Sequence, residues 1–101
     1  VTDQALVALV LGVNLLNVDR ILIVEHTQCA MATSSEDELK RRLGESSGRD
    51  AEWMTLGAID DQRRTIEADV IRVKTHPLIS DTVSVGGFLY DVDSGLLEPI
   101  V

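Results

Sequence analysis

The sequence predicts an α/β fold, a central and mostly parallel sheet flanked by helices. An apolar helical pattern at residues 3–16 leads directly into four consecutive aliphatic residues at 21–24, an order typical of a helix followed by a parallel strand. A second helical pattern at 58–74 then precedes a second strand pattern at 83–92. With 101 residues, the chain has the length of one small domain, so we expect a single folding unit rather than two domains.

The first helix should begin at Thr2, whose hydroxyl can cap the first turn, and end near Asn17. Almost every side chain between these two residues is apolar, which is typical of a helix buried on all sides. The strand at 21–24 lacks polar alternation as well, so we expect it to be covered on both faces. The residues after it lie at the carboxyl end of a central strand, where open α/β sheets place their sites.

A short helix is predicted in the middle of the chain. Ser35 and Glu38 have the spacing of a capping box, and acidic residues fill the first turn that would follow. The basic residues at 40–42, with Gly44 just beyond them, predict the end of this helix.

The last third of the chain predicts a helix, a strand and a tail. Apolar residues recur at helical spacing over 58–74, and the His-Pro dipeptide at 76–77 should stop that helix, because the residue before proline leaves the α region. Residues 83–92 predict the last strand, and 96–101 are expected to form a short tail.

Charge and composition exclude several classes of partner. The chain has 17 acidic and 9 basic residues, a net charge of −8, whereas nucleic acids and anionic membrane surfaces select basic patches. No apolar segment reaches the roughly 18 residues that a membrane span needs. Cys29 is the only cysteine, which excludes an internal disulfide and suits a reducing compartment. We therefore expect a cytoplasmic protein that binds neither nucleic acid nor membrane.

The pair His26 and Cys29, directly after the predicted strand, is the one pattern that indicates chemistry. Imidazole nitrogen and thiolate sulfur are both good zinc ligands, and the two side chains can converge if the backbone turns after the strand. Zinc in such a site lowers the pKa of its water towards about 7, which provides hydroxide at neutral pH. The pair is therefore a candidate metal site.

A buried cysteine beside an incidental histidine is the simpler structural explanation of the same pattern. A zinc site needs three or four protein ligands, and the chain has no second cysteine. His76 is the only other histidine, and its neighbours favour a residue in a loop or at a helix end. Met31 could line a pocket, but a methionine after a buried strand is more typical of core packing.

Three blocks of the sequence resemble the β-class carbonic anhydrases. The first is Val-Thr-Asp at 1–3, which opens an apolar helix, and the second is the strand at 21–24 followed by His-Thr-Gln-Cys-Ala-Met at 26–31. The third is His-Pro-Leu-Ile at 76–79 with the strand and hairpin at 83–96. The blocks occur in the family's order over nearly the whole chain, which is far more specific than a His-x-x-Cys pair alone.

The resemblance implies a zinc ion held by two cysteines and one histidine, of which His26 and Cys29 are two. The family's first cysteine belongs to a Cys-x-Asp-x-Arg motif, whose Asp–Arg pair lies beside the metal, and we expect this motif upstream of Val1. Ala30 stands where the family usually has glycine, and with Met31 it is expected to line the substrate pocket. Residues 1–101 would then be the C-terminal part of a single β-carbonic anhydrase-like domain, with the last strand antiparallel at an edge of the sheet.

The activity that the resemblance implies is the zinc-dependent, reversible hydration of carbon dioxide to bicarbonate, by a homodimer or a larger homo-oligomer. We expect little activity from these residues alone. Hydrolases of carbonyl sulfide or carbon disulfide have a similar fold and similar ligands, and they are the first alternative. The second is a non-catalytic zinc- or partner-binding relic that has lost the first ligand.

Overall fold

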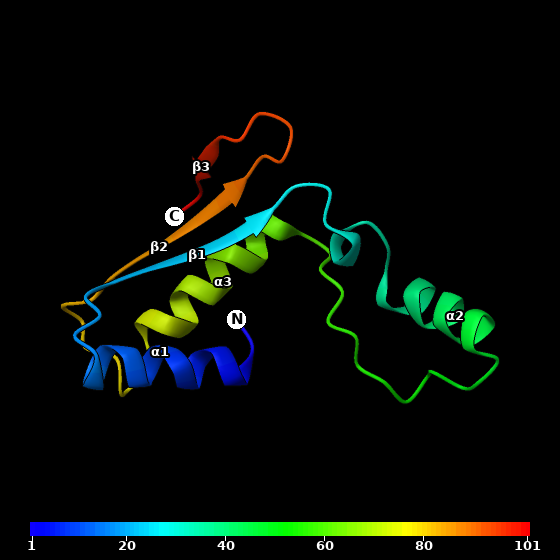
Figure 1. The fold of residues 1–101 in the computed structure, drawn as a ribbon, viewed down its shortest axis with the longest axis horizontal. Helices are drawn as coiled ribbons and strands as arrows, with labels where there is room; N and C mark the ends of the chain where they lie inside the picture. Colours follow the sequence, from blue (N-terminus) through cyan, green and yellow to red (C-terminus); the bar gives the residue numbers. More distant parts are fainter. The chain divides into compact units, whose positions relative to one another are not determined.

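The computed structural model describes all residues, 1–101 (Figure 1). Its helices and strands are, in chain order, α1 (Asp3–Leu15), β1 (Arg20–His26), the short 3-10 helix η1 (Ala30–Ala32), α2 (Glu36–Ser47), α3 (Gln62–Lys74), β2 (Ser84–Tyr90) and β3 (Leu97–Pro99). The chain divides into two compact units. The first unit comprises Val1–Thr27 and Arg63–Val101, and the second unit comprises Gln28–Gln62.

The sheet belongs to the first unit and has the strand order β1-β2-β3. Strands β1 and β2 are parallel, with Arg20 opposite Ser84 and His26 opposite Tyr90, whereas β3 is antiparallel to β2. The predicted α/β fold with an antiparallel strand at one edge is therefore confirmed, in the form of a mixed sheet.

The expectation of a tail at 96–101 was wrong, because β3 is a strand. Leu97 to Pro99 pair with β2, and Glu98 also forms an ion pair with Arg63 of α3 at 2.8 Å. A strand this short shows no periodic signal, and its proline argues against a strand unless it lies at an edge, as it does here. The strand predicted at 83–92 is β2, two residues shorter at its C-terminal end.

The core of the first unit lies between one face of the sheet and two helices. Three side chains of α3 are completely buried: Ile66, Val70 and Val73. Val70 and Val73 lie with the inward-facing strand residues Ile21, Ile23 and Val85, while α1 adds the partly buried Leu6, Leu9, Val10 and Val13. Gly87 allows this packing, since a Cβ there would lie 2.3 Å from Cγ2 of Ile66.

The prediction that β1 is covered on both faces was wrong. Ile21 and Ile23 are buried, but Leu22 and Val24, which point the opposite way, are about half exposed. The reason is that α1 and α3 pack against the same face of the sheet, and no other element of the first unit covers the opposite face. A run of aliphatic residues shows that the strand can be buried on both faces. It does not show whether other helices or strands cover both faces.

Helix α1 begins and ends as predicted. The Thr2 hydroxyl accepts a hydrogen bond from the Ala5 amide at 3.1 Å, and Asn17, just past the helix, has a left-handed φ of 59°. The expectation of a helix buried on all sides was wrong, because Gly12 is its only buried residue. One side of α1 packs on the core and the other is exposed.

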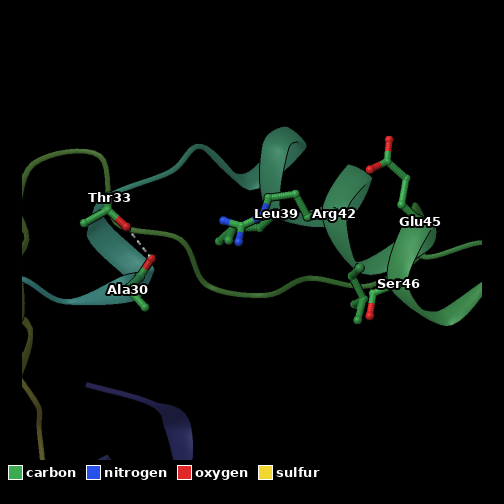
Figure 2. Close-up of a pocket in the computed structure, with 7 residues that line it drawn as sticks. Ala30, Thr33, Leu39, Arg42, Glu45 and Ser46 are labelled. Carbon is green, nitrogen blue, oxygen red and sulfur yellow. Dashed lines mark hydrogen bonds between the residues drawn. The ribbon is translucent and has the colours of Figure 1, made fainter.

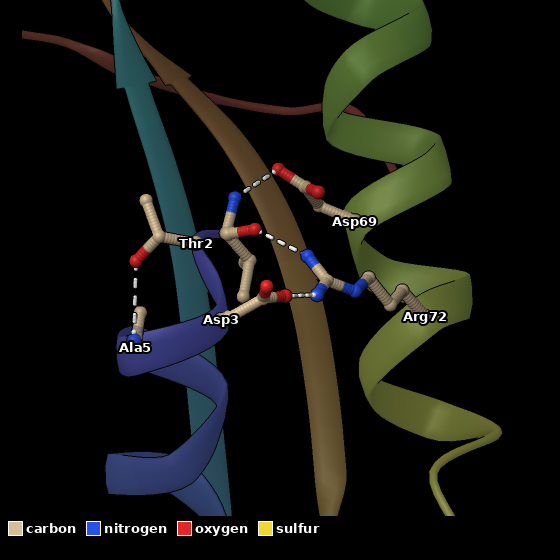
Figure 3. Close-up of polar contacts among 6 residues, drawn as sticks. Thr2, Asp3, Ala5, Asp69 and Arg72 are labelled. Carbon is tan, nitrogen blue, oxygen red and sulfur yellow. Dashed lines mark hydrogen bonds and ion pairs between the residues drawn. The ribbon is translucent and has the colours of Figure 1, made fainter. Parts of the chain in front are cut away.

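The start of α1 is attached to α3 by polar contacts (Figure 3). The Val1 nitrogen donates to Asp69 at 2.6 Å, and the Arg72 guanidinium donates both to the Val1 carbonyl and to the Asp3 carboxylate. These bonds hold the start of α1 beside α3.

Helix α2 begins as predicted and is longer than predicted. Ser35 caps it by accepting from the Glu38 amide at 3.1 Å, but the helix continues through Gly44 to Ser47. Gly48, with φ of 68°, is the residue that ends it. The continuation past Gly44 is supported by Arg41, which pairs with Glu45 on the far side of that glycine at 2.6 Å.

Helix α3 begins at Gln62, four residues after the predicted start at 58, and ends at Lys74 before the His-Pro dipeptide, as predicted. The difference arises because the amides of Leu56, Ala58 and Ile59 bind partners elsewhere in the second unit. Those bonds hold the backbone before Gln62 outside a helix, and extending the helix to residue 58 would break them.

Candidate functional site

His26 is the last residue of β1, and its ring has a defined hydrogen bond. Its Nδ1 lies 2.8 Å from the carbonyl oxygen of Thr27. A carbonyl can only accept, so Nδ1 carries the hydrogen and donates it. In the neutral ring, Nε2 is then the acceptor nitrogen, and this is the kind of imidazole nitrogen that binds a metal.

The backbone after His26 is held and then turned. The Thr27 amide donates to the Tyr90 carbonyl at 2.9 Å, and the Thr27 hydroxyl accepts from the Val92 amide at 3.1 Å. These two bonds fix the residue just after β1. The next residue, Gln28, has a φ of 55°, in the left-handed region that residues other than glycine seldom adopt. The backbone therefore turns directly after the strand, as a site built from both side chains requires.

Cys29 lies just past this turn, at the start of the second unit. Its thiol is free and partly buried, and its carbonyl accepts from the Ala32 amide at 3.0 Å to form η1. The two sequence-predicted ligands thus lie on either side of the junction between the units, with His26 in the first unit and Cys29 in the second. Their convergence on one ion stays a prediction.

Ala30 borders an open hollow of about 670 Å³ in the second unit (Figure 2). The other lining includes Thr33, whose hydroxyl donates to the Ala30 carbonyl at 3.1 Å, and Arg42 from α2. Met31 is partly buried, and its carbonyl accepts from the Ile59 amide at 2.7 Å. The assignment of Ala30 and Met31 to a substrate pocket stays a prediction; what the structure adds is that Met31 anchors the loop before α3.

Glu36 organises the second unit, and the sequence analysis did not identify it. Its carboxylate accepts from the Leu56 amide at 2.9 Å and the Ala58 amide at 3.1 Å. These two bonds, with a smaller contribution from the charge of Lys40, hold the pKa of Glu36 below its ordinary value of 4.5. An acidic residue in the first turn of a helix is sufficiently explained by its favourable interaction with the helix N-terminus. The neighbouring sequence does not indicate that its partners lie 20 residues away.

The residues present fit part of a zinc site. One imidazole, with its hydrogen on Nδ1, and one free thiol are two donors of the kind that zinc prefers. The structure brings together no group of three or more His, Cys, Asp or Glu side chains that could hold a metal ion. His76 lies after α3, where its Nδ1 accepts from the Leu78 amide at 3.1 Å. No helix is long and apolar enough to cross a bilayer.

The chain is similar to two kinds of curated enzyme. It is 28% identical to β-carbonic anhydrase 1 of Mycobacterium tuberculosis over 103 residues, which cover 99% of this chain and 61% of that protein. It is 30% identical to a carbon disulfide hydrolase of Acidithiobacillus thiooxidans over 116 residues, covering 97% of this chain and 53% of the hydrolase. The sequence matches no family model.

The fold shows the same relationship. The crystal structure of carbonic anhydrase from Streptococcus mutans superposes with a TM-score of 0.88 at 27% identity, covering 100% of this chain and 61% of that one. The chain thus spans between half and two thirds of the length of the relatives it matches, a partial coverage that fits a C-terminal portion. Similarity along nearly the whole sequence and a shared fold together support a β-carbonic anhydrase-like family.

Proposed function

We propose that this chain contributes two protein ligands, His26 and Cys29, to a zinc centre that catalyses the reversible hydration of carbon dioxide. The observation that carries the proposal is the hydrogen bond from His26 Nδ1 to the Thr27 carbonyl, because it sets the ring tautomer in which Nε2 is the acceptor nitrogen, the form of imidazole that binds a metal. Zinc, when bound, supplies the Lewis acidity that makes water nucleophilic at neutral pH.

The residues of this chain would prepare the site. The Thr27 carbonyl orients the imidazole and increases the basicity of Nε2, which is the usual role of a second hydrogen-bond partner of a metal-binding histidine. Thr27 is in turn held by Tyr90 and Val92, so the ring orientation is tied to the β1–β2 ladder. Cys29 would bind as the thiolate and offset one of the two positive charges of the ion.

A third protein ligand is expected from the part of the family's fold that these 101 residues do not span. Two ligands alone should bind zinc weakly, because a zinc site ordinarily has three or four. We therefore expect low affinity and little hydration activity from the 101-residue chain, and higher values when the remaining segment is present.

Titration of the 101-residue chain with cobalt(II), a spectroscopic substitute for zinc, tests the ligand assignment. Binding should produce a thiolate-to-cobalt charge-transfer absorption in the near ultraviolet, which Cys29→Ser should abolish and His26→Ala should weaken. His76→Ala is the matched control and should leave the spectrum unchanged. A spectrum that survives Cys29→Ser, or that responds equally to the two histidine variants, contradicts the assignment.

Carbon disulfide hydrolysis is the second candidate function, and the relative at 30% identity favours it. Turnover of carbon dioxide, carbon disulfide and carbonyl sulfide, each measured with the intact protein, distinguishes the candidate functions. Faster turnover of carbon dioxide supports the hydration proposal, and faster turnover of either sulfur compound replaces it. Zinc binding without turnover of any of the three indicates a non-catalytic relic.

A further inference from the structure

Residues 56–59, which we call the brace, bind the carboxylate of Glu36. The amides of Leu56 and Ala58 donate to its two oxygens, at 2.9 Å and 3.1 Å. Between them, Gly57 has a left-handed φ of 81°, and a residue of this conformation lets neighbouring amides face the same anion. Each carboxylate oxygen of Glu36 therefore has its own amide donor, so the brace requires a side chain with two acceptor oxygens.

The brace also holds the segment that follows Cys29. The Ile59 amide, at the end of the brace, donates to the Met31 carbonyl at 2.7 Å. Met31 is the middle residue of η1, and this short helix begins with the bond from the Ala32 amide to the Cys29 carbonyl at 3.0 Å. Hydrogen bonds in series thus connect the Glu36 carboxylate to the backbone of Cys29, and every residue in the series belongs to the second unit.

Apolar packing contributes little to the position of Cys29. Ala51 is the only buried residue of the second unit, and no residue of η1 is buried. The Cys29 thiol itself is free and only partly buried. Because so few side chains are packed here, the hydrogen bonds of the brace are the main restraint on the backbone that carries the thiol.

We propose that Glu36 is a positioning residue for Cys29, and that its carboxylate, acting through the brace, holds the thiol in place for zinc. The role of the metal rests on the proposed function, whereas the position of the thiol rests on the hydrogen bonds alone. A thiolate that is already fixed loses less conformational freedom when a metal binds, so Glu36 favours both affinity and a single geometry. In this role Glu36 is not itself a ligand.

The reaction of Cys29 with a pyridyl disulfide reagent tests the position of the thiol without any metal. It is measured on the 101-residue chain at neutral pH with a chelator present. Glu36→Gln should raise the rate by about tenfold, because its amide side chain can accept from only one brace amide, and losing one charge-assisted hydrogen bond corresponds to about that factor. Asp37→Asn is the matched control, since it removes the same charge from a side chain that binds neither brace amide, and it should leave the rate unchanged.

Gly57→Val perturbs the brace without altering any charge. A Cβ at Gly57 would meet no atom within 4 Å, but a β-branched residue disfavours a φ of 81°. The variant should therefore raise the rate at Cys29 as Glu36→Gln does, and Gly57→Asn should have a smaller effect because asparagine adopts the left-handed conformation more readily. Combining Gly57→Val with Glu36→Gln should raise the rate no further than either change alone, since both open the same brace.

The spectrum of the cobalt(II)-saturated chain separates positioning from a general loss of local stability. A variant that only loosens the second unit binds cobalt more weakly, yet it gives the parent spectrum once it is saturated. If Glu36 sets the position of the thiolate, the charge-transfer absorption of Glu36→Gln should stay shifted or weakened at saturation. Glu36→Asp keeps a carboxylate and should return the spectrum towards that of the parent. Circular dichroism establishes that the first unit is folded in each variant.

Three results overturn the proposal. They are a rate at Cys29 that Glu36→Gln leaves unchanged, an equal increase from Asp37→Asn, and a saturated cobalt spectrum that is the same in Glu36→Gln and the parent. A chain that binds no cobalt through Cys29 contradicts the proposed function instead. In that case the thiol rates, which need no metal, still support or overturn the positioning of Cys29 by Glu36.

Discussion

Each of the two units of the chain is stabilised internally by a different kind of interaction. The first unit contains a sheet and a core with three completely buried aliphatic side chains. The second unit has a single buried residue, Ala51, and depends on polar contacts to its backbone. These include the two amides bound by Glu36, the bond from Ile59 to Met31, and the bond from the Lys40 ammonium to the Glu52 carbonyl at 3.1 Å.

The difference means that the two units should respond to different perturbations. Burial of aliphatic side chains depends little on pH, whereas hydrogen bonds accepted by a carboxylate require that it be ionised. The aromatic residues allow the units to be observed separately. Trp53, the only tryptophan, lies in the second unit, and Tyr90, the only tyrosine, lies in the first.

The largest effect is expected from Ile66→Ala in the core of the first unit. Ile66 is fully buried, so its removal loses the transfer free energy and leaves a cavity, at a cost of about 2–5 kcal/mol. Unfolding in urea followed by circular dichroism measures this change. The exposed control Ile71→Ala should stay within about 0.5 kcal/mol of the parent. Equal losses at both positions would show that the first unit lacks a specific core.

The second unit should open in acid while the first unit remains folded. The pKa of Glu36 is lower in the folded chain than its ordinary 4.5, mainly because of the amide bonds from Leu56 and Ala58. Its contribution to stability is therefore fully present above pH 4.5 and is lost as the pH falls through the lowered pKa. Trp53 fluorescence should change over this acidic range, before circular dichroism reports loss of the first unit.

Glu36→Gln provides the control for the acid transition. The amide side chain has no carboxyl group to protonate, so the acid change in Trp53 fluorescence should disappear. It also offers the backbone one acceptor and one donor in place of two acceptors. Asp37→Asn alters the neighbouring carboxylate, which binds neither Leu56 nor Ala58, and should preserve it. A transition that persists in Glu36→Gln would assign it to a different carboxylate.

The smallest effects are expected at the two helix caps. Thr2 and Ser35 each accept one amide hydrogen bond at 3.1 Å, so Thr2→Ala and Ser35→Ala remove the same interaction from different units. Thr2→Ala should lower the free energy of unfolding of the first unit by about 1 kcal/mol. Ser35→Ala should leave that value unchanged and speed hydrogen exchange at the Glu38 amide. A shared effect of both variants would mean that the two units unfold together.

Local signals predicted the starts of two helices correctly. Thr2 and Ser35 cap their helices because a hydroxyl at that position needs only the amide three residues further on. Only half of the capping box forms, since the Glu38 carboxylate pairs with Arg41 at 2.7 Å. The parallel pairing of the two main strands was also predictable, because a helical segment lies between them in the chain and parallel strands need such a crossover connection.

What the sequence could not provide were features set by distant partners. The start of α3 depends on Glu36, which lies more than 20 residues before it. The exposure of α1 and of one side of β1 depends on which layers are present, and no local pattern contains that information. At the candidate site, the sequence alone indicated His26 and Cys29 as a pair of possible ligands after the strand. The hydrogen bond that sets the tautomer of His26 could be seen only in the structure.

The connection between β1 and β2 has a consequence for synthesis on the ribosome. Strand β1 ends at His26, and its only partner in this chain begins at Ser84, so residues 27–83 must be translated before the ladder can form. At bacterial or eukaryotic elongation rates this takes on the order of ten seconds. During that interval the side of β1 that pairs with β2 is unpaired and available to other nascent chains, which makes this aliphatic segment a natural substrate for a chaperone.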